Sequence, residues 1–251
     1  MIASTLLTLA AASVAMGQAL SCPQPSVVTV RKCNTASSAS IQIAQTLGDR
    51  SPFVAPSTVS ICYTNDAIKL TFANTKEPYY SVNPAYGHND NIWEQTVAEA
   101  FIVNVPSHDV DPQTYLEFEV SPTNQTYSAF IYNPSKVRAA GTPFDHFFVG
   151  SQPIDSSNSC KDGRCARFDG ITASTVQNRD QKTWTSDVSI PLALFNVQKP
   201  SGTLWRANFF RTTYNQSSGV QQYGAWNAPN VISFHQTPCF GSLRFAGSDS
   251  R

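Results

Sequence analysis

The feature that most constrains the fold of this chain is a strict alternation of apolar and polar side chains in several short runs. In residues 68–72 the apolar side chains alternate with Lys69 and Thr71, and the same period of two recurs in residues 115–120 and 205–209. A period of two places successive side chains on opposite faces of a β-strand. One apolar and one polar face are typical of antiparallel sheets that are buried on one side.

Further strand-like runs extend this pattern. Strands are predicted at residues 27–31, 97–103, 126–132, 184–190 and 243–245, with Pro and Gly clusters between the runs. Helix signals are scarce, apart from one predicted turn that begins near Pro191. The sequence therefore predicts an all-β protein, an antiparallel β-sandwich of the jelly-roll or immunoglobulin-like kind. Residues 139–178 lack the regular pattern and are predicted to form a long loop.

Residues 1–19 have the composition of an export signal. Leu6, Leu7 and Leu9 contribute to a short apolar core, and small residues suited to cleavage follow it. This core is too short to span a bilayer, so we expect a soluble protein that is secreted and extracellular. Residues 20–251 fit a single domain, because β-sandwiches of about 200–250 residues commonly fold as one unit. We expect that domain to be a monomer.

The charge of the chain is balanced, with 17 basic and 17 acidic residues. Proteins that bind nucleic acid or an anionic membrane surface usually carry a basic excess. The composition therefore argues against both as partners.

All six cysteines follow the predicted signal, and an even number of cysteines in an exported chain predicts disulfides. Cys160 and Cys165 are predicted to pair with each other across the short turn between them, which would staple the long loop. Three pairings remain open among Cys22, Cys33, Cys62 and Cys239.

Two Asn-x-Ser/Thr sequences follow the predicted signal. They begin at Asn124 and Asn215. In a secreted protein such sequences are acceptors for N-glycosylation, so both are predicted to lie on exposed loops and to carry glycans.

Six landmarks rich in aromatic residues occur in one order along the chain. They are Trp93-Glu-Gln with Glu99-Ala-Phe101, residues 115–122, residues 184–192, residues 205–211, Ala225-Trp-Asn-Ala-Pro229, and Phe234-His with Phe240-Gly-Ser-Leu243. In this order, over roughly residues 60–245, the chain resembles the family 9 carbohydrate-binding modules and their secreted relatives among the DOMON-like β-sandwiches. The resemblance implies a sandwich that binds sugar.

The resemblance also implies a sugar site built from two tryptophans and a carboxylate. Trp93 and Trp226 match the pair that sandwiches a terminal sugar in family 9 modules, and Glu99 matches an acidic residue that hydrogen-bonds sugar hydroxyls there. An indole stacks on the apolar face of a sugar ring, and a carboxylate bonds hydroxyls directionally. The alternative is that both tryptophans are half-buried core residues, because Trp is highly buried on average.

Three further residues are candidates for the same site. Asn208 and Arg211 lie on a predicted strand and would add donors, and His88 lies in the loop before the first tryptophan. At one place the sequence departs from family 9 modules. The strand that carries an arginine in those modules here reads Glu117-Phe-Glu119, with no basic residue.

A haem module is the main rival, because some DOMON-like sandwiches hold haem between a Met and a His. The methionines of this chain, Met1 and Met16, both lie in the predicted signal, so the mature chain lacks a Met ligand. Ligation by two histidines stays open, from the set His88, His108, His146 and His235. Of these, we expect His235 to be a structural hydrogen-bonding partner.

Calcium is a further candidate ligand, because carboxylate and amide oxygens suit it. The candidate donors are Asp90, Asp109, Asp111 and Asp145. No loop has the spacing of a known calcium motif, and these residues are also ordinary turn formers.

An enzymatic role finds little support. A glycosidase needs two carboxylates facing one cleft, and the acidic candidates are Glu94, Glu99, Glu117 and Glu119. Alternation predicts that Glu117 and Glu119 share a strand face that points outward. The Gly-x-Ser-x-Gly turn of a serine nucleophile is absent, and no predicted cleavage site leaves the N-terminal His that a copper monooxygenase needs. We therefore predict a secreted, non-catalytic protein that binds a poly- or oligosaccharide.

Overall fold

The computed structural model describes residues 19–23, 27–33, 38–149, 151–153, 165–167 and 169–247. Apart from Ala19, the predicted export signal lies outside these residues. Cys160 lies outside them too, and with it the predicted Cys160–Cys165 disulfide. Among the described residues, no helix has the length and apolar character needed to cross a membrane.

Strands dominate the secondary structure of the described residues. In chain order they are β1 (Val27–Val30), β2 (Ala39–Thr46), β3 (Pro52–Tyr63), β4 (Ala67–Asn74), β5 (Val97–Val105), β6 (Thr114–Val120), β7 (Thr126–Tyr132), β8 (Asp145–Phe148), β9 (Ser151–Pro153), β10 (Cys165–Arg167), β11 (Thr172–Asn178), β12 (Thr183–Pro191), β13 (Leu204–Tyr214), β14 (Gln221–Ala225) and β15 (Gly241–Phe245). Short 3-10 turns accompany them at η1 (Ile92–Glu94), η3 (Leu192–Phe195) and η4 (Thr237–Cys239). The turn predicted near Pro191 is therefore present as η3.

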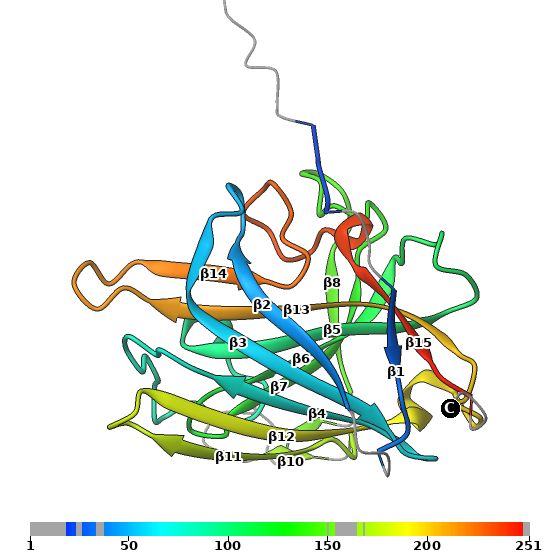
Figure 1. The fold of residues 1–251 in the computed structure, drawn as a ribbon, viewed down its shortest axis with the longest axis horizontal. Coiled ribbons are helices and arrows are strands. Elements are labelled where there is room, and N and C mark those ends of the chain that lie inside the picture. The colour runs from blue at the N-terminus through cyan, green and yellow to red at the C-terminus, as the bar shows by residue number, and fades with distance from the viewer. Residues whose placement is uncertain are drawn as a thin grey trace, which may run out of the picture.

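The main sheet curls so that its two halves face each other. Its hydrogen-bonded path runs β11-β12-β4-β3-β2-β14-β13-β5-β6-β7-β8, and every pair along this path is antiparallel. Off the path, β15 pairs with β13, and β1 pairs in parallel with β15. In Figure 1 the strands β2, β3 and β4 cross over the strands β13, β5 and β6. The predicted antiparallel β-sandwich is confirmed.

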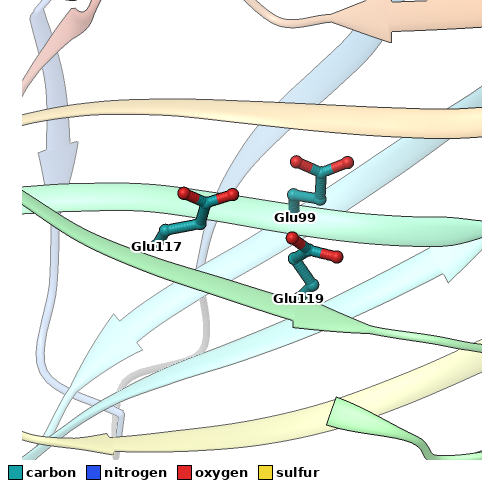
Figure 2. Close-up of side chains that lie close together, drawn as sticks. All are labelled: Glu99, Glu117 and Glu119. Atoms are coloured by element: carbon teal, nitrogen blue, oxygen red, sulfur yellow. The ribbon is translucent and has the colours of Figure 1, made fainter. Parts of the chain in front are cut away.

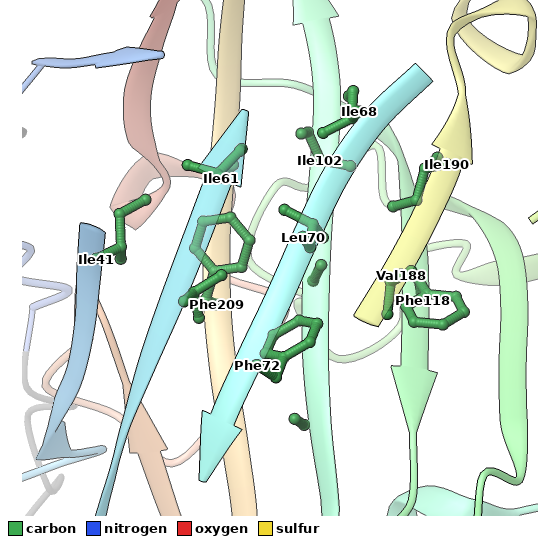
Figure 3. Packing of buried hydrophobic residues seen from close by; sticks show 14 of the residues in the cluster. Ile41, Ile61, Ile68, Leu70, Phe72, Ile102, Phe118, Val188, Ile190 and Phe209 are labelled. Carbon is green, nitrogen blue, oxygen red and sulfur yellow. The ribbon is translucent and has the colours of Figure 1, made fainter. Parts of the chain in front are cut away.

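The main hydrophobic core lies between these two halves, as Figure 3 shows. Ile61 of β3 and Leu70 of β4 pack in one cluster with Phe118 of β6 and Phe209 of β13. All four are at most 2 % exposed. Leu70, Phe118 and Phe209 are apolar members of the alternating runs, so the alternation correctly identifies the inner face of these strands.

A second apolar cluster covers the other face of β5, β6 and β13. Phe101, Tyr115, Phe210 and Phe240 are fully buried there. The loop between β14 and η4 lies over them, and its Phe234 ring stacks on Phe210 with 4.5 Å between the ring centroids. This part of the sheet is therefore buried on both faces.

This second cluster makes the predicted outward position of Glu117 and Glu119 wrong. The two side chains do share one face of β6, but they are only 5 % and 0 % exposed. Alternation shows which residues share a face of a strand. It does not show that a loop more than a hundred residues later along the chain will cover that face.

The predicted long loop at residues 139–178 is partly wrong, because β8 and β11 lie within it. Both are edge strands of the main sheet. The sequence of β11, TASTVQN, is mainly polar, and its residues alternate between exposed and half-buried. An edge strand of this kind buries too little apolar surface to leave an alternating pattern in the sequence.

The structure selects one of the three open cysteine pairings. Cys22 pairs with Cys239 and Cys33 pairs with Cys62, each with a Cα–Cα distance of 4.9 Å. The first disulfide ties the N-terminal segment to η4, and the second ties the segment after β1 to β3. These pairs join segments that are distant in sequence, which is why spacing along the chain does not predict them.

Candidate functional site

A pocket of about 320 Å³ lies on the sheet face that the β14–η4 loop covers. Small-molecule sites commonly have volumes of roughly 300–1,000 Å³. The lining residues come from η1, five strands and two loops: Trp93, Glu99, Glu117, Arg138, His146, Thr212, Gln221, Tyr223, Ile232, Ser233, Phe234 and His235. The pocket therefore combines aromatic side chains with several that are ionisable.

Two neighbouring strands place three carboxylates at the floor of this pocket. Glu99 of β5 is the register partner of Glu119 of β6, and Glu117 lies two residues before Glu119. One carboxylate oxygen from each glutamate lies within 4.8 Å of the other two, and Figure 2 shows the three side chains gathered in one place. Glu99 and Glu117 line the pocket, whereas Glu119 lies behind them and is fully buried.

The three carboxyl groups resist ionisation. Burial, together with the charge of Glu117, holds the pKa of Glu99 well above its ordinary value. Burial and the charges of Glu99 and Glu117 do the same to the pKa of Glu119, and burial raises the pKa of Glu117 to about 8. Like charges at short distance in a buried site cannot all ionise without a compensating cation.

Few groups of the protein compensate this cluster. The hydroxyl of Thr212 donates a hydrogen bond to Oε1 of Glu99 at 3.3 Å. Glu117 and Glu119 hydrogen-bond to each other when one of the two is protonated and donates. When both are ionised, the oxygens of Glu119 and Oε2 of Glu117 are buried without a hydrogen-bond donor among the described residues. The ion pairs found within the described ranges are Arg206–Asp111 and Arg211–Glu77, and neither includes a glutamate of the cluster.

An exposed tryptophan stands at the edge of the pocket. Ile92 is fully buried and anchors the short η1 turn, so the next residue, Trp93, points away from the core and is 38 % exposed. Its ring forms a T-shaped contact with that of Tyr127, with 5.4 Å between the centroids and an interplanar angle of 84°. Tyr223 and Phe234 add two further rings to the lining, 5.5 Å apart.

Two histidines line the pocket, and each is held by a tyrosine. Nδ1 of His235 lies 2.7 Å from the hydroxyl of Tyr115, and Nδ1 of His146 contacts the hydroxyl of Tyr127. Burial lowers the pKa of His235 to about 3 and also lowers the pKa of His146. His235 is thus the structural partner expected from the sequence, and near neutral pH it is uncharged.

Trp226 does not lie at this pocket. It follows β14, is half-buried, and packs against the main core with 5.9 Å between its ring and that of Phe209. The structure therefore does not bring Trp226 together with Trp93. Its position matches the alternative interpretation of a half-buried core tryptophan.

Asn208 is buried and engaged with the backbone near that tryptophan. Its Oδ1 accepts the N–H of Asn227 at 3.1 Å, and its Nδ2 donates to the carbonyl of Asn227 at 2.9 Å. It is 1 % exposed and does not line the pocket. Its side chain fixes the start of the covering loop.

Arg211 does not line the pocket either, although the next residue, Thr212, does. Its side chain is fully buried, forms an ion pair with Glu77, and lies 4.8 Å from the ring of Trp184, whose Nε1 donates to Glu77 at 2.9 Å. Burial lowers the pKa of Arg211 to about 9. Arg211 is thus part of a buried ion pair, with no side-chain surface to offer a ligand.

The remaining candidates are spread over the molecule. His88 is half-buried, lies outside the pocket lining, and has Nδ1 within 2.9 Å of the hydroxyl oxygen of Thr126. His108 contacts the carbonyl of Leu243 at 3.0 Å through Nε2. The aspartates proposed as calcium donors are Asp90, Asp109, Asp111 and Asp145. None of them belongs to a group of three or more metal-ligating side chains among the described residues. In the described part of the chain, such a group is formed by Glu99, Glu117 and Glu119.

The two predicted glycosylation sites lie in exposed turns. Asn124 lies between β6 and β7, and Asn215 lies between β13 and β14; both are exposed. The side chain of Asn124 accepts a hydrogen bond from Thr175 at 3.0 Å, and that of Asn215 accepts the N–H of Ser217 at 2.9 Å.

Structural comparison confirms the class of fold. The chain superposes on a protein from Bacteroides uniformis described as a "putative carbohydrate-binding protein", with a TM-score of 0.61 and 14% sequence identity, covering 88% of this chain and 100% of that one. Two structures of a family 9 carbohydrate-binding module from Caldicellulosiruptor kristjanssonii, with cellotriose and with glucose, match with TM-scores of 0.49 and 0.47. Their identities are 12% and 13%, covering 90% and 89% of this chain and 96% and 86% of those chains. At this level of identity, the first match shows a shared β-sandwich fold.

Sequence comparison identifies the family. No known family model matches the sequence. A protein of Arthroderma benhamiae named "Extracellular protein" is 45% identical over 206 residues, covering 82% of this chain and 85% of the relative. The chain belongs to the same family as this extracellular protein.

Several pocket residues escape the sequence analysis. Arg138, Gln221 and Tyr223 come from a loop and from a short strand, and no motif connects them. One signal was available for the acidic floor. Glu117 and Glu119 stand where an arginine is expected from the resemblance, so the change of charge marks the place where the site differs.

Proposed function

We propose that this chain is a secreted carbohydrate-binding protein, and that a sugar unit binds in the pocket beside Trp93. The observation that carries the proposal is the pairing of an exposed indole with polar, carboxylate-bearing pocket walls. Trp93 is 38 % exposed at the pocket edge, and Glu99 and Glu117 line the interior.

The two kinds of side chain have different tasks in this proposal. The indole stacks on the apolar face of a sugar ring, as aromatic rings do with flat apolar surfaces. The carboxyl groups bond the hydroxyls, and Gln221 and Thr212 add further polar contacts from the lining. Tyr223 takes the place that the resemblance assigned to a second stacking tryptophan.

The fold and family are consistent with this function. The chain shares its fold with the Bacteroides protein described as carbohydrate-binding. Secretion is supported by the extracellular relative and by two disulfides between described cysteines, because disulfides persist in oxidising compartments. In this proposal residues 20–251 form one domain that acts without catalysis.

A glycosidase is the second candidate, favoured by one observation. Retaining glycosidases hold two carboxyl groups about 5–5.5 Å apart, one of them with a raised pKa. The cluster has carboxylate oxygens within 4.8 Å of each other, and Glu117 has a pKa of about 8. Release of reducing ends from a panel of polysaccharides, compared between wild type and Glu117→Gln, separates hydrolysis from binding.

The experiment for the binding function is a glycan screen with a matched pair of variants. Wild type, Trp93→Ala and Trp226→Ala are screened against immobilised glycans, and any ligand found is titrated by calorimetry. We expect Trp93→Ala to weaken binding and folded Trp226→Ala to retain it. If a sugar binds and Trp93→Ala has no effect, the pocket is not the site; if no glycan binds the folded wild type, the function is wrong.

A further inference from the structure

Glu119 is the least compensated ionisable group of the pocket region. Its side chain is fully buried, and its hydrogen bond to Glu117 requires one of the two to be protonated. When both are ionised, neither carboxylate oxygen of Glu119 has a hydrogen-bond donor among the described residues. Buried polar atoms are almost always hydrogen-bonded, so the ionised carboxylate needs a ligand or a cation. Figure 2 shows this carboxylate directed toward the other two glutamates.

The basic residues near the cluster do not satisfy it. Arg138 lines the same pocket and its charge favours the ionised form of Glu117, but its guanidinium lies over the ring of Phe144 at 4.4 Å and forms no ion pair with the described glutamates of the cluster. Arg211 is committed to Glu77. The floor of the pocket therefore brings three carboxylates together without an ion pair within the described residues.

The spacing of these oxygens suits a divalent cation with hard oxygen ligands. Calcium binds oxygens at about 2.3–2.6 Å, so two ligands on opposite sides of the ion lie about 4.6–5.2 Å apart. One oxygen from each of Glu99, Glu117 and Glu119 lies within 4.8 Å of the other two. Small side-chain rotations can thus bring all three into contact with one ion.

We propose that Glu99, Glu117 and Glu119 together hold one divalent cation, calcium by preference, at the floor of the pocket. Glu119 ligates the ion from the buried side, and Glu99 and Glu117 ligate it from the pocket walls. Calcium is favoured over magnesium because it takes six to eight ligands in flexible geometry. Three carboxylates leave coordination positions open toward the cavity of about 320 Å³.

The open positions give the cation a role in the proposed function, on which this step rests. Hydroxyl oxygens are hard ligands, and two neighbouring hydroxyls of a sugar can occupy two free positions of a calcium ion. The ring would then lie between the cation and Trp93. Sugar binding at this site is therefore expected to depend on the cation.

Calorimetric titration of the metal-stripped protein with calcium chloride, and separately with magnesium chloride, tests the cation site without any sugar. We expect one calcium per chain, with at least tenfold weaker binding in Glu119→Gln and in Glu99→Gln. Glu94→Gln is the matched control, because Glu94 is an exposed carboxylate next to Trp93 and outside the cluster. The inference is overturned if the folded wild type binds no calcium, or if Glu119→Gln binds calcium as tightly as the wild type does.

A second titration separates this inference from the proposed function. A sugar identified by the glycan screen is titrated into wild type with calcium and with EDTA. Loss of sugar binding in EDTA supports the inference, and equal binding in both buffers overturns it while leaving the sugar function intact. If calcium binds through Glu119 but no glycan binds, the cation site stands and the sugar function falls.

Discussion

Glu99 of β5 lies directly opposite Glu119 of β6, and both carboxyl groups are buried. Like charges in direct cross-strand positions destabilise a sheet, and here a third carboxyl group, that of Glu117, joins them. A fold keeps such an arrangement at a cost in stability. The cost falls when the groups are protonated or when a cation binds, so the stability of the protein should depend on pH and on calcium.

The metal-stripped protein is predicted to lose stability through these carboxyl groups as pH rises. The pKa of Glu117 is raised from an ordinary value of 4.5 to about 8. The favourable contribution of the protonated groups is fully present below pH 4.5 and is lost as pH rises through about 8. Thermal unfolding in EDTA between pH 5 and 9 measures the effect, and calcium should restore Tm at the alkaline end.

Other ionisable groups lie near the cluster, so the comparison is made against Glu119→Gln. The groups that face the cluster or share its pocket are Tyr115, Tyr127, Arg138, His146, Tyr223 and His235. The lowered pKa of His235 acts in the opposite sense, because its contribution is present above its unfolded pKa and is lost as pH falls. Glu119→Gln keeps that histidine and removes one acid. Its Tm in EDTA should exceed that of wild type at pH 8.5 and should not respond to calcium; a variant less stable than wild type there would contradict the prediction.

Loss of Trp93 is predicted to lower sugar affinity, whereas loss of Trp226 is predicted to lower stability. Trp93→Ala removes an exposed ring, so sugar affinity should fall about tenfold, or about 1.4 kcal/mol, with little change in Tm. Trp226→Ala removes a half-buried ring from the main core and should cost about 2 kcal/mol of stability, less than the roughly 3–5 kcal/mol of a fully buried tryptophan. Calorimetry with the screened glycan and urea unfolding measure the two effects. If sugar affinity falls in Trp226→Ala and not in Trp93→Ala, the site lies at Trp226 and the prediction is wrong.

The buried Arg211–Glu77 pair is predicted to be a structural element with no part in ligand binding. Arg211→Met leaves Glu77 buried and unpaired, which should cost about 3–5 kcal/mol in the free energy of unfolding. The double variant Arg211→Met with Glu77→Gln should recover much of this loss, because no isolated charge remains. Urea unfolding of the three proteins measures the coupling. A single variant as stable as wild type would show that the pair is not formed.

The two disulfides are predicted to contribute unequally. Cys22–Cys239 joins residues separated by 217 positions, and Cys33–Cys62 joins residues separated by 29. In the chain-entropy account a longer loop loses more freedom in the unfolded state, and removal of a native disulfide costs about 2–5 kcal/mol. Replacing Cys22 and Cys239 by Ser should therefore destabilise the protein more than replacing Cys33 and Cys62. Urea midpoints in the opposite order would contradict this.

The amino-acid sequence by itself determined the strands that line the main core. Leu70, Phe118 and Phe209 recur with a period of two, and this period reflects burial of one face, which is a local property of each strand. It also singled out Trp93 and Glu99, and both line the same pocket. Both lie on a single continuous segment that leads from η1 into β5, so their proximity needs no distant contact.

Only the tertiary structure decided which other residues join them. Trp226 and Arg211 turn to the main-core side of the sheet, whereas Tyr223 and Phe234 reach the pocket. The structure also turned Glu117 and Glu119 from expected surface residues into a buried cluster. The physical reason is the curl of the sheet and the path of the β14–η4 loop, because together they bury a second strand face that no local pattern records.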